Sequence, residues 1–265
     1  MHPSAAHINE TLHRYFDKVL VLTVRRFTDR HAKVQQQLEG IDFEFFYGTD
    51  KQQFTPDFVR QHYRYDKNVS LSVRQVFPPL NEGEIACALS HCNIYEAILA
   101  NNWQRVLILE DDVVPDWDAL AKLDKVLDEL PEGWELVYLG YLKNNKRTAG
   151  LLLKQSWYHV MRALGMSKLS HRRTKHIAPQ PFSTHLWRAG FHDCTHAYAV
   201  SLEGARKLLA AQTPVVYRAD NLLTALVVDE QLQAYAVKEY LFNQEIFSDI
   251  DAPSHVRTHK PKKAE

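Results

Sequence analysis

Four apolar residues at positions 106–109 lead directly into three consecutive carboxylates, Glu110, Asp111 and Asp112. An uninterrupted apolar run is typical of a strand that is buried on both faces of a parallel sheet. We expect this strand to stop at Pro115, because proline lacks the backbone N–H that a strand ladder uses. Ligands of open α/β sheets bind just beyond the carboxyl ends of the strands. The pattern therefore predicts that the three carboxylates lie at a ligand-binding edge.

The rest of the hydrophobic pattern predicts strands and helices in alternation. Apolar runs predict further strands at residues 18–24, 43–47, 134–139, 196–201 and 239–242. Apolar residues at helical spacing predict helices at residues 31–38, 81–99, 120–127, 203–211 and 219–228. Thr28 is the expected cap of the first helix, and Gly140 is expected to end its strand. This alternation predicts an α/β fold with a mostly parallel central sheet flanked by helices.

Two segments interrupt the alternation. Residues 51–80 are polar and aromatic with weak periodicity, which predicts an irregular excursion with short helices. Residues 143–192 carry ten Lys or Arg and no Asp or Glu, although the whole chain has 32 residues of each sign. This basic insertion also holds bulky apolar residues. It could therefore lie on an anionic membrane, meet an anionic acceptor, or cover the acidic remainder of the same protein.

The expected organisation is one large domain with appended ends. Its divisions are an N-terminal extension (1–17), the α/β domain (18–254) with its two insertions, and a basic tail (255–265). A chain of 265 residues, 45% of them apolar, can bury a full core. We expect a cytoplasmic protein, because the chain shows no run of about 18 apolar residues, no signal-peptide pattern and no C-x-x-C pair among its three cysteines.

Familiar nucleotide motifs are absent from the sequence. It contains no G-x-x-x-x-G-K-[ST] loop and no G-x-G-x-x-G turn, and it has only nine glycines. These absences disfavour P-loop NTPases and Rossmann dehydrogenases. We also expect no nucleic-acid partner.

The three adjacent carboxylates suggest a divalent cation. They repel one another, and holding them at the rim of a core is costly unless a cation compensates their charge. Hard oxygen ligands suit Mg²⁺ or Mn²⁺, which would grip a phosphate-bearing substrate. Glu110 and Asp112 can point together, since alternate side chains of a strand share a face. The alternative is a solvated acidic turn after a core strand.

Several blocks of the chain, taken in order, resemble glycosyltransferase family 25. This family contains the bacterial lipopolysaccharide and lipooligosaccharide glycosyltransferases, with collagen galactosyltransferases as distant relatives. The blocks are residues 21–30, 45–50, the E-G-E-I-A-C-A-L-S-H of 82–91, the L-I-L-E-D-D-V of 107–113, 134–140 and 195–209. The resemblance covers about residues 19–251. Ala86 stands where the family usually has glycine, which we expect to affect packing more than chemistry.

The resemblance implies a GT-A type, nucleotide-sugar-binding fold and an inverting, metal-dependent glycosyltransferase. The enzyme would move a hexose, commonly galactose from UDP-galactose, to a hydroxyl of a cell-envelope glycan such as lipooligosaccharide. Its cofactor would be Mn²⁺ or Mg²⁺. Its place would be the cytoplasm, with peripheral contact to the inner face of the anionic cytoplasmic membrane as a further option. The sequence leaves the oligomeric state open.

Two functions of other classes stay open beside this one. The first is a catalytically silent nucleotide-sugar- or glycan-binding module of the same fold. The intact acid cluster argues against it. The second is a metal-dependent nucleotide-sugar phosphohydrolase that uses the same cluster without a glycan acceptor.

The resemblance and the local chemistry together give candidate site residues. We expect Asp112 to ligate the metal directly, with Glu110 and the late residue His255 as further ligands. The residues expected to bind the donor are Thr23, Arg26, Arg30, Glu84, Ser90, His91, Glu110 and Asp111. Arginines after the first strand could pair with diphosphate oxygens in a bidentate manner.

Inversion in one displacement needs a general base near the acceptor hydroxyl, usually a carboxylate. Asp220 is the first candidate, because it stands where the family has an Asp before a helix. The alternative for Asp220 is a helix N-cap. Asp193 is the second candidate base.

Overall fold

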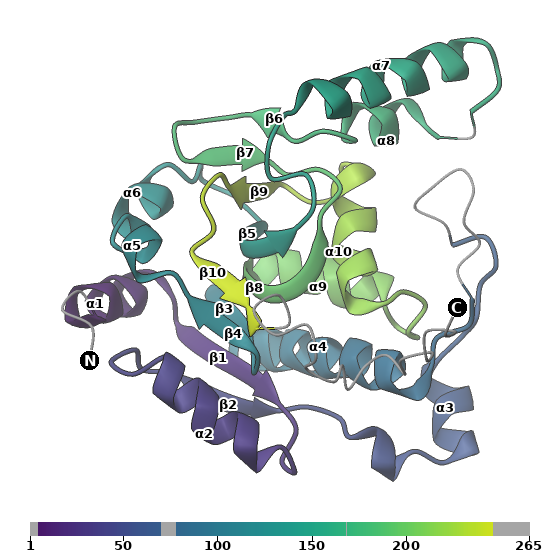
Figure 1. The fold of residues 1–265 in the computed structure, drawn as a ribbon. Helices are drawn as coiled ribbons and strands as arrows, with labels where there is room; N and C mark the ends of the chain where they lie inside the picture. Colours follow the sequence, from purple (N-terminus) through teal and green to yellow (C-terminus); the bar gives the residue numbers. More distant parts are fainter. Residues whose placement is uncertain (1–4, 70–77, 168, 246–265) are drawn as a thin grey trace, which may run out of the picture.

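The structure, a computed structural model, describes residues 5–69, 78–167 and 169–245. An eight-stranded sheet forms its centre, with helices on both faces (Figure 1). The strands are β1 (Lys18–Thr23), β2 (Glu44–Tyr47), β3 (Arg105–Glu110), β4 (Val113–Pro115), β5 (Leu136–Leu142), β6 (Gln180–Pro181), β7 (Leu186–Arg188), β8 (Asp193–Ser201), β9 (Ala234–Val237) and β10 (Phe242–Gln244). The helices are α1 (Ala5–Tyr15), α2 (Thr28–Gln37), η1 (Lys51–Gln53), α3 (Pro56–His62), α4 (Glu82–Asn101), α5 (Trp117–Leu120), α6 (Leu123–Asp128), α7 (Ala149–Ala163), α8 (His171–Lys175), α9 (Leu202–Ala211) and α10 (Ala219–Val228).

The strand order in the large sheet is β2-β1-β3-β8-β5-β9-β7-β6. β1 pairs in parallel with β2 and β3, and β5 pairs in parallel with β9. β8 is antiparallel to β3 and β5, and β7 is antiparallel to β9 and β6, so six strands run one way and two the other. The predicted α/β fold with a mostly parallel sheet is therefore confirmed. β4 and β10 form a separate antiparallel pair.

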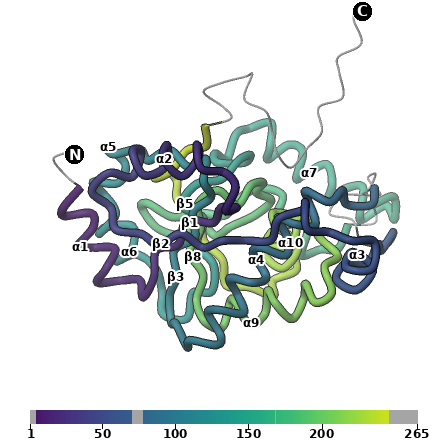
Figure 2. Tube along the Cα trace, turned by 90° about the horizontal axis from the view of Figure 1, so that it is seen from below, coloured from purple at the N-terminus to yellow at the C-terminus, as the bar shows by residue number. Residues whose placement is uncertain are grey.

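The apolar run at the centre of the sequence forms the centre of the sheet. Residues 106–109 of β3 are 0% exposed, because β3 lies between β1 and β8 and helices cover both faces of the sheet. Figure 2 shows α2 on one side of the sheet and α9 on the other, and α4 packs against α9. Burial on both faces explains why this strand has no polar alternation.

The order of the first three strands creates a crevice at the carboxyl ends of β1 and β3. The chain passes from β1 through α2 to β2 at the edge of the sheet, and then returns to β3 on the other side of β1. Right-handed crossovers in these two directions put their helices on opposite faces. At such a switch point the helices diverge and leave room for a ligand beyond the strands. Thr23 ends β1 and Glu110 ends β3, so both border this crevice.

Three local predictions about element ends are wrong. Thr28 is the first residue of α2, and the cap position belongs to Phe27, which makes no side-chain cap bond. The strand formed by the apolar run already ends at Glu110, and Pro115 is instead the last residue of the next short strand, β4. Proline is tolerated there because β4 pairs with only one other strand. Gly140 lies inside β5 and does not end it.

The structure also holds elements that the hydrophobic pattern did not predict. Residues 5–15, before the first strand, form α1, whose Ile8 and Leu12 are buried in the main core. The expected helix at 120–127 is two short helices, α5 and α6. β9 was not expected, and the last strand, β10, begins at Phe242.

Gly140 fits where it does because β10 passes directly over β5. A β-carbon at Gly140 would overlap the backbone oxygen of Phe242 and the ring of His196. His196 Nε2 lies 3.3 Å from that same Phe242 oxygen, which ties β10 to β8. The absence of a side chain at Gly140 thus lets β10 reach the crevice edge.

His192, buried just before β8, is held as a neutral imidazole. Its Nε2 accepts a hydrogen bond from the Gly190 N–H at 3.1 Å, so Nδ1 carries the proton and donates to the Lys143 oxygen at 3.1 Å. Burial lowers the pKa of His192 from 6.5 to about 4. The protonated form would lose both the Gly190 bond and the solvation it needs.

We predict that His192 makes the protein less stable in weak acid. Between about pH 6.5 and pH 4 the unfolded chain protonates this imidazole and the folded protein does not, so the free energy of unfolding falls as the pH falls. The contribution is at most about 3 kcal/mol. Urea titrations of the wild type and His192→Gln across this range should show their difference shrinking towards low pH. The exposed His159→Gln serves as the control; parallel curves for wild type and His192→Gln would contradict the assignment.

Candidate functional site

The predicted acid cluster lies at the crevice between β1 and β3, as its position after β3 requires. β3 ends at Glu110, and Asp111 and Asp112 form the turn into β4. All three carboxylates sit at the edge of the core, and Asp111 and Asp112 are both buried. Each makes different contacts, so the three are not equivalent.

Asp111 is fully engaged by protein groups. Its Oδ1 lies 2.5 Å from Nη1 of Arg30 on α2, and its Oδ2 accepts a 2.6 Å hydrogen bond from the Thr23 hydroxyl at the end of β1. These contacts tie the β3 turn to β1 and α2. They place the predicted residues Thr23, Arg30 and Asp111 together, with the carboxylate turned toward β1.

Glu110 faces the opposite way, toward α4 and β8. Thr195 Oγ1 donates to Glu110 Oε1 at 2.5 Å, and His91 Nε2 lies 3.3 Å from the same oxygen. His91 Nδ1 lies 2.8 Å from the Tyr198 hydroxyl, which is 2.9 Å from the Tyr95 hydroxyl. Burial acts to raise the pKa of Glu110, but the contacts with His91 and Thr195 outweigh it and lower that pKa below its ordinary value.

Asp112 is the carboxylate with the least compensation. It is 8% exposed, and Gln244 of β10 donates to its Oδ2 at 3.0 Å. Its Oδ1 is buried, and no group among residues 5–69, 78–167 and 169–245 bonds to it. Burial, followed by the nearby charges of Glu110 and Asp111, raises the pKa of Asp112 to about 7.

The donor set suits a hard divalent cation. A buried carboxylate oxygen without a partner, beside two further carboxylates, is the kind of group that Mg²⁺ or Mn²⁺ binds. Asp112 and Glu110 are the residues that would hold such an ion. His255, the third expected ligand, lies outside the described residues.

A second ligand geometry lies next to the acid cluster. The Sγ of Cys87, a ring nitrogen of His91 and a carboxylate oxygen of Glu110 lie within 4.8 Å of one another. Cys87 and His91 are one turn apart on α4, so both can reach the end of β3. Burial raises the pKa of the Cys87 thiol well above its usual value, and the charges of Glu110, Asp220, Asp112 and Glu84 raise it further. The Cys87 thiol is therefore protonated at neutral pH.

A pocket of about 120 Å³ opens beside the cluster, between β1, α2 and the start of α4. Arg26, Phe27 and Asp50 line it, together with Glu110 and Asp111. Arg26 Nε bonds to Asp50 Oδ2 at 2.7 Å and its guanidinium stacks on Phe27. The predicted arginines thus border the pocket while paired with carboxylates of the same chain.

Glu84 and Ser90 hold α4 in place. Glu84 closes a capping box with Asn81, and its carboxylate forms an ion pair with Arg218, 2.7 Å from Nε. Ser90 Oγ accepts from the Thr49 N–H at 2.9 Å, and Gly48 packs against this side chain. Ser90 lines the pocket, whereas Glu84 is buried at the start of α4.

The two candidate bases lie in different surroundings. Asp193, at the start of β8, forms an ion pair with Lys143 and is partly exposed. Asp220 lies in the first turn of α10, whose cap position is Arg218, so the N-cap alternative for Asp220 is wrong. Cys194 has a φ of 70° and its N–H points at Asp220 Oδ2, 3.5 Å away. The charge of Asp220 is among the causes that raise the pKa of Cys87.

Several residues at the site carried no predicted role. Thr195 and Tyr198 come from β8, which lies antiparallel between β3 and β5, and Gln244 comes from β10. Thr195 and Tyr198 lie inside the block of residues 195–209 that resembles the family. That resemblance was the sequence signal by which they could have been found. Cys87 sits at helical spacing from Glu84 and His91, and that spacing was a second signal.

Known proteins resemble this chain over most of its length. A sequence profile described as glycosyltransferase family 25 (LPS biosynthesis protein) matches residues 16–223. A glycosyltransferase 25 family member of Anopheles gambiae is 28% identical over 202 residues, 73% of this chain and 28% of that protein. Human procollagen galactosyltransferase 2 is 24% identical over 205 residues, 74% of this chain and 28% of that protein.

Two further similar proteins carry names that state inactivity or transfer of a different sugar. The human inactive glycosyltransferase 25 family member 3 is 30% identical over 136 residues, 50% of this chain and 18% of that protein. Mouse xyloside xylosyltransferase 1 aligns in structure over 88% of this chain and 79% of its own, with 10% identity and a TM-score of 0.42. The chain spans less than a third of the length of each of the three family 25 relatives. The match of the profile to residues 16–223 covers well over half of the chain, which therefore belongs to glycosyltransferase family 25.

Proposed function

We propose that this protein is an inverting, metal-dependent glycosyltransferase that moves galactose from UDP-galactose to a hydroxyl of a cell-envelope glycan such as lipooligosaccharide. The family supports glycosyl transfer, and its description as an LPS biosynthesis protein supports the acceptor class. The name of the human procollagen galactosyltransferase supports galactose. The roles of individual residues below are part of the proposal.

One observation carries the metal dependence. Asp112 is buried beside two other carboxylates, its Oδ1 has no partner among the described residues, and its pKa is raised to about 7. A carboxylate in that state is costly to ionise unless a cation compensates it. A divalent ion held by Asp112 and Glu110 would stabilise the negative charge that develops on a nucleoside diphosphate leaving group.

The residues around the ion would then orient the donor. Glu110 is fixed by Thr195 and His91, and Asp111 is fixed by Thr23 and Arg30, so the acid turn offers a preorganised geometry. Arg26 and Arg30 border the adjacent pocket and would supply positive charge near the diphosphate.

The transfer itself is a single displacement. A carboxylate takes the proton of the acceptor hydroxyl, the hydroxyl oxygen bonds to the anomeric carbon, and the bond from that carbon to the diphosphate oxygen breaks with release of the nucleoside diphosphate. We assign the base to Asp220. Asp193, whose carboxylate forms an ion pair with Lys143, is the second candidate.

We predict that Asp112→Asn lowers the rate of transfer from UDP-galactose at least about a hundredfold, because the amide cannot replace a charged metal ligand. Transfer to a truncated lipooligosaccharide, measured with Mn²⁺ and with a chelator, checks this. Asp118→Asn, an exposed change on α5, is the matched control and should keep wild-type transfer. A wild-type rate of transfer by Asp112→Asn would contradict the proposed metal role. Hydrolysis of the donor without any acceptor would instead favour a phosphohydrolase.

The base assignment predicts different results for the two carboxylates. Asp220→Asn should lower kcat by about 10²–10⁴-fold, the usual loss when a general base is removed, while UDP-galactose still binds. Asp193→Asn should keep kcat within a few-fold of the wild type. Steady-state kinetics and calorimetric titration of UDP-galactose measure the two effects separately. A large kcat loss for Asp193→Asn with little for Asp220→Asn would reverse the assignment.

A further inference from the structure

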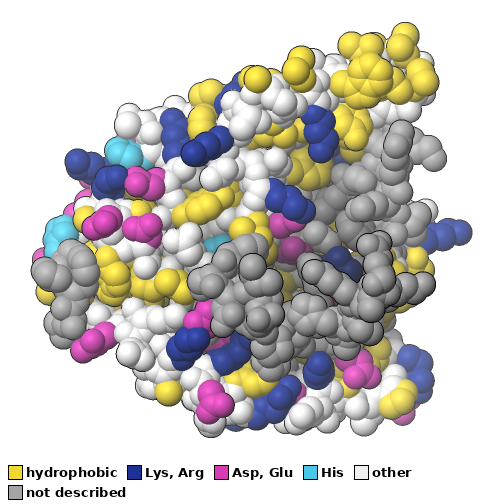
Figure 3. All heavy atoms as spheres, viewed as in Figure 1, with side chains coloured by type: hydrophobic (Ala, Val, Ile, Leu, Met, Phe, Trp, Pro, Cys, Tyr) yellow, Lys and Arg dark blue, Asp and Glu magenta, His cyan; other side chains and the backbone are white. Residues whose placement is uncertain are grey.

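The helix α7 carries a row of large apolar side chains that nothing in the described structure covers. Their exposed fractions are 71% for Leu153, 62% for Trp157, 52% for Val160, 66% for Leu164 and 65% for Met166, just beyond the helix. The first four stand at spacings of four, three and four residues, so they share one face of the helix. Figure 3 shows hydrophobic side chains gathered on this part of the molecule, with Lys and Arg side chains close to them.

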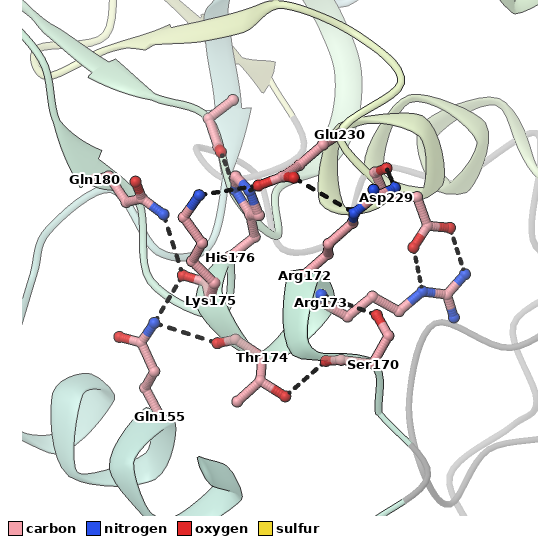
Figure 4. A network of polar contacts seen from close by, with 11 residues as sticks. Gln155, Ser170, Arg172, Arg173, Thr174, Lys175, His176, Gln180, Asp229 and Glu230 are labelled. Carbon is pink, nitrogen blue, oxygen red and sulfur yellow. Dashed lines mark hydrogen bonds and ion pairs between the residues drawn. The ribbon is translucent and has the colours of Figure 1, made fainter. Parts of the chain in front are cut away.

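The opposite side of α7 is fixed to the body of the protein through α8. Gln155 donates to the backbone oxygens of Thr174 and Lys175, at 3.2 and 2.7 Å. α8 is held in turn by acids that follow α10. Arg173 makes two 2.7 Å bonds to the carboxylate of Asp229 (Figure 4).

Glu230 strengthens the same anchor. Its Oε1 lies 2.9 Å from Lys175 Nζ and 3.1 Å from His176 Nε2, and Arg172 lies 3.5 Å from its other oxygen. These contacts lower the pKa of Glu230 to about 2, the bond from Lys175 having the largest effect. A helix docked in this way keeps its apolar face turned outward.

The anchor divides the basic residues of this segment into two groups. Those on α8 are paired with Asp229 and Glu230. Among the described residues, Lys146 and, on α7, Lys154 and Arg162 form no ion pair, and all three are basic groups next to or on the apolar helix. Residues 143–192 contain no acid at all, so no negative charge of this segment opposes an anionic surface.

These features together fit one kind of partner. An amphipathic helix with Trp and Leu on one face and Lys and Arg beside it lies in the plane of an anionic lipid surface, with its apolar side between the headgroups. Trp157 suits that depth, because indole favours the boundary between acyl chains and water. The long side chain of Lys154, the residue next to Leu153, can extend to the lipid phosphates.

We propose that the face of α7 formed by Leu153, Trp157, Val160 and Leu164 docks the protein onto an anionic lipid bilayer. Attachment is peripheral: within the described residues, no helix has the length and apolar content to cross a membrane. Binding needs neither donor nor metal, so this proposal does not rest on the proposed function and can fail independently of it.

The test is co-flotation of the full chain with vesicles of phosphatidylcholine alone and of phosphatidylcholine with about 30% phosphatidylglycerol. We expect flotation with the anionic vesicles and a partition coefficient at least about tenfold lower with the neutral ones. Leu153→Ser with Trp157→Ser should lower binding to anionic vesicles at least about tenfold. Tyr65→Ser, a change at an exposed aromatic residue outside residues 143–192, is the matched control and should bind as the wild type does.

The charge contribution has its own pair of variants. Lys146→Gln with Lys154→Gln should weaken anionic binding several-fold and reduce its dependence on salt. Lys67→Gln with Lys125→Gln removes the same charge from exposed positions elsewhere and should change it far less. Circular dichroism and thermal melting confirm that each variant is folded.

Two results would overturn the proposal. One is equal flotation of the wild type and the folded Leu153→Ser, Trp157→Ser variant with anionic vesicles, including the absence of flotation for both. The other is a lipid-free dimer, seen by analytical ultracentrifugation, that this variant abolishes; the apolar face would then cover a second copy of the chain.

Discussion

Three consecutive carboxylates at the end of a buried strand each need polar or basic groups that compensate their negative charge. The contacts that supply these groups connect the elements around the crevice. Asp111 is compensated by Arg30 and Thr23, which binds the turn to β1 and α2. Glu110 is compensated by Thr195 and His91, which binds it to β8 and α4. Asp112 receives one bond from Gln244 and keeps a buried oxygen without a partner among the described residues. The incomplete compensation of Asp112 is the observation on which the proposed cation site rests.

Other parts of the fold position the three carboxylates and the groups that contact them. β3 needs apolar neighbours on both faces to bring the acids to the rim, and the return of the chain from β2 across β1 leaves a crevice there. The capping box of Asn81 and Glu84 fixes the start of α4, and with it the direction of His91. The missing side chain of Gly140 lets β10 approach closely enough to place Gln244 on Asp112. The proposed base, Asp220, belongs to the same surroundings, since its charge and the charges of Glu110 and Asp112 all raise the pKa of the Cys87 thiol.

Sequence alone predicted the parts that depend on local pattern. Four apolar residues followed by acids located β3 and its rim, and helical spacing located α4 and α10. Contacts that depend on long-range pairing were not predictable: Thr195 and Gln244 lie 85 and 132 residues from the acids they contact. The sequence also showed arginines after β1, but it did not show that Arg30 forms an ion pair with Asp111 of the same chain. Pro115 was expected to end the strand of the apolar run and instead ends β4, because the sequence does not reveal that a turn at Asp111 and Asp112 separates the two strands.

The central claim is that the acid cluster binds a divalent cation through Asp112. Electron paramagnetic resonance of Mn²⁺ titrated into the full chain with UDP present tests it directly, because free and bound Mn²⁺ give different signals. The account predicts a saturable bound ion in the wild type, and binding weakened at least about tenfold in Asp112→Asn, since a metal ligand is lost. Equal binding of Mn²⁺ by the two proteins, or binding of UDP that a chelator leaves unchanged with no bound Mn²⁺ detected, would contradict it.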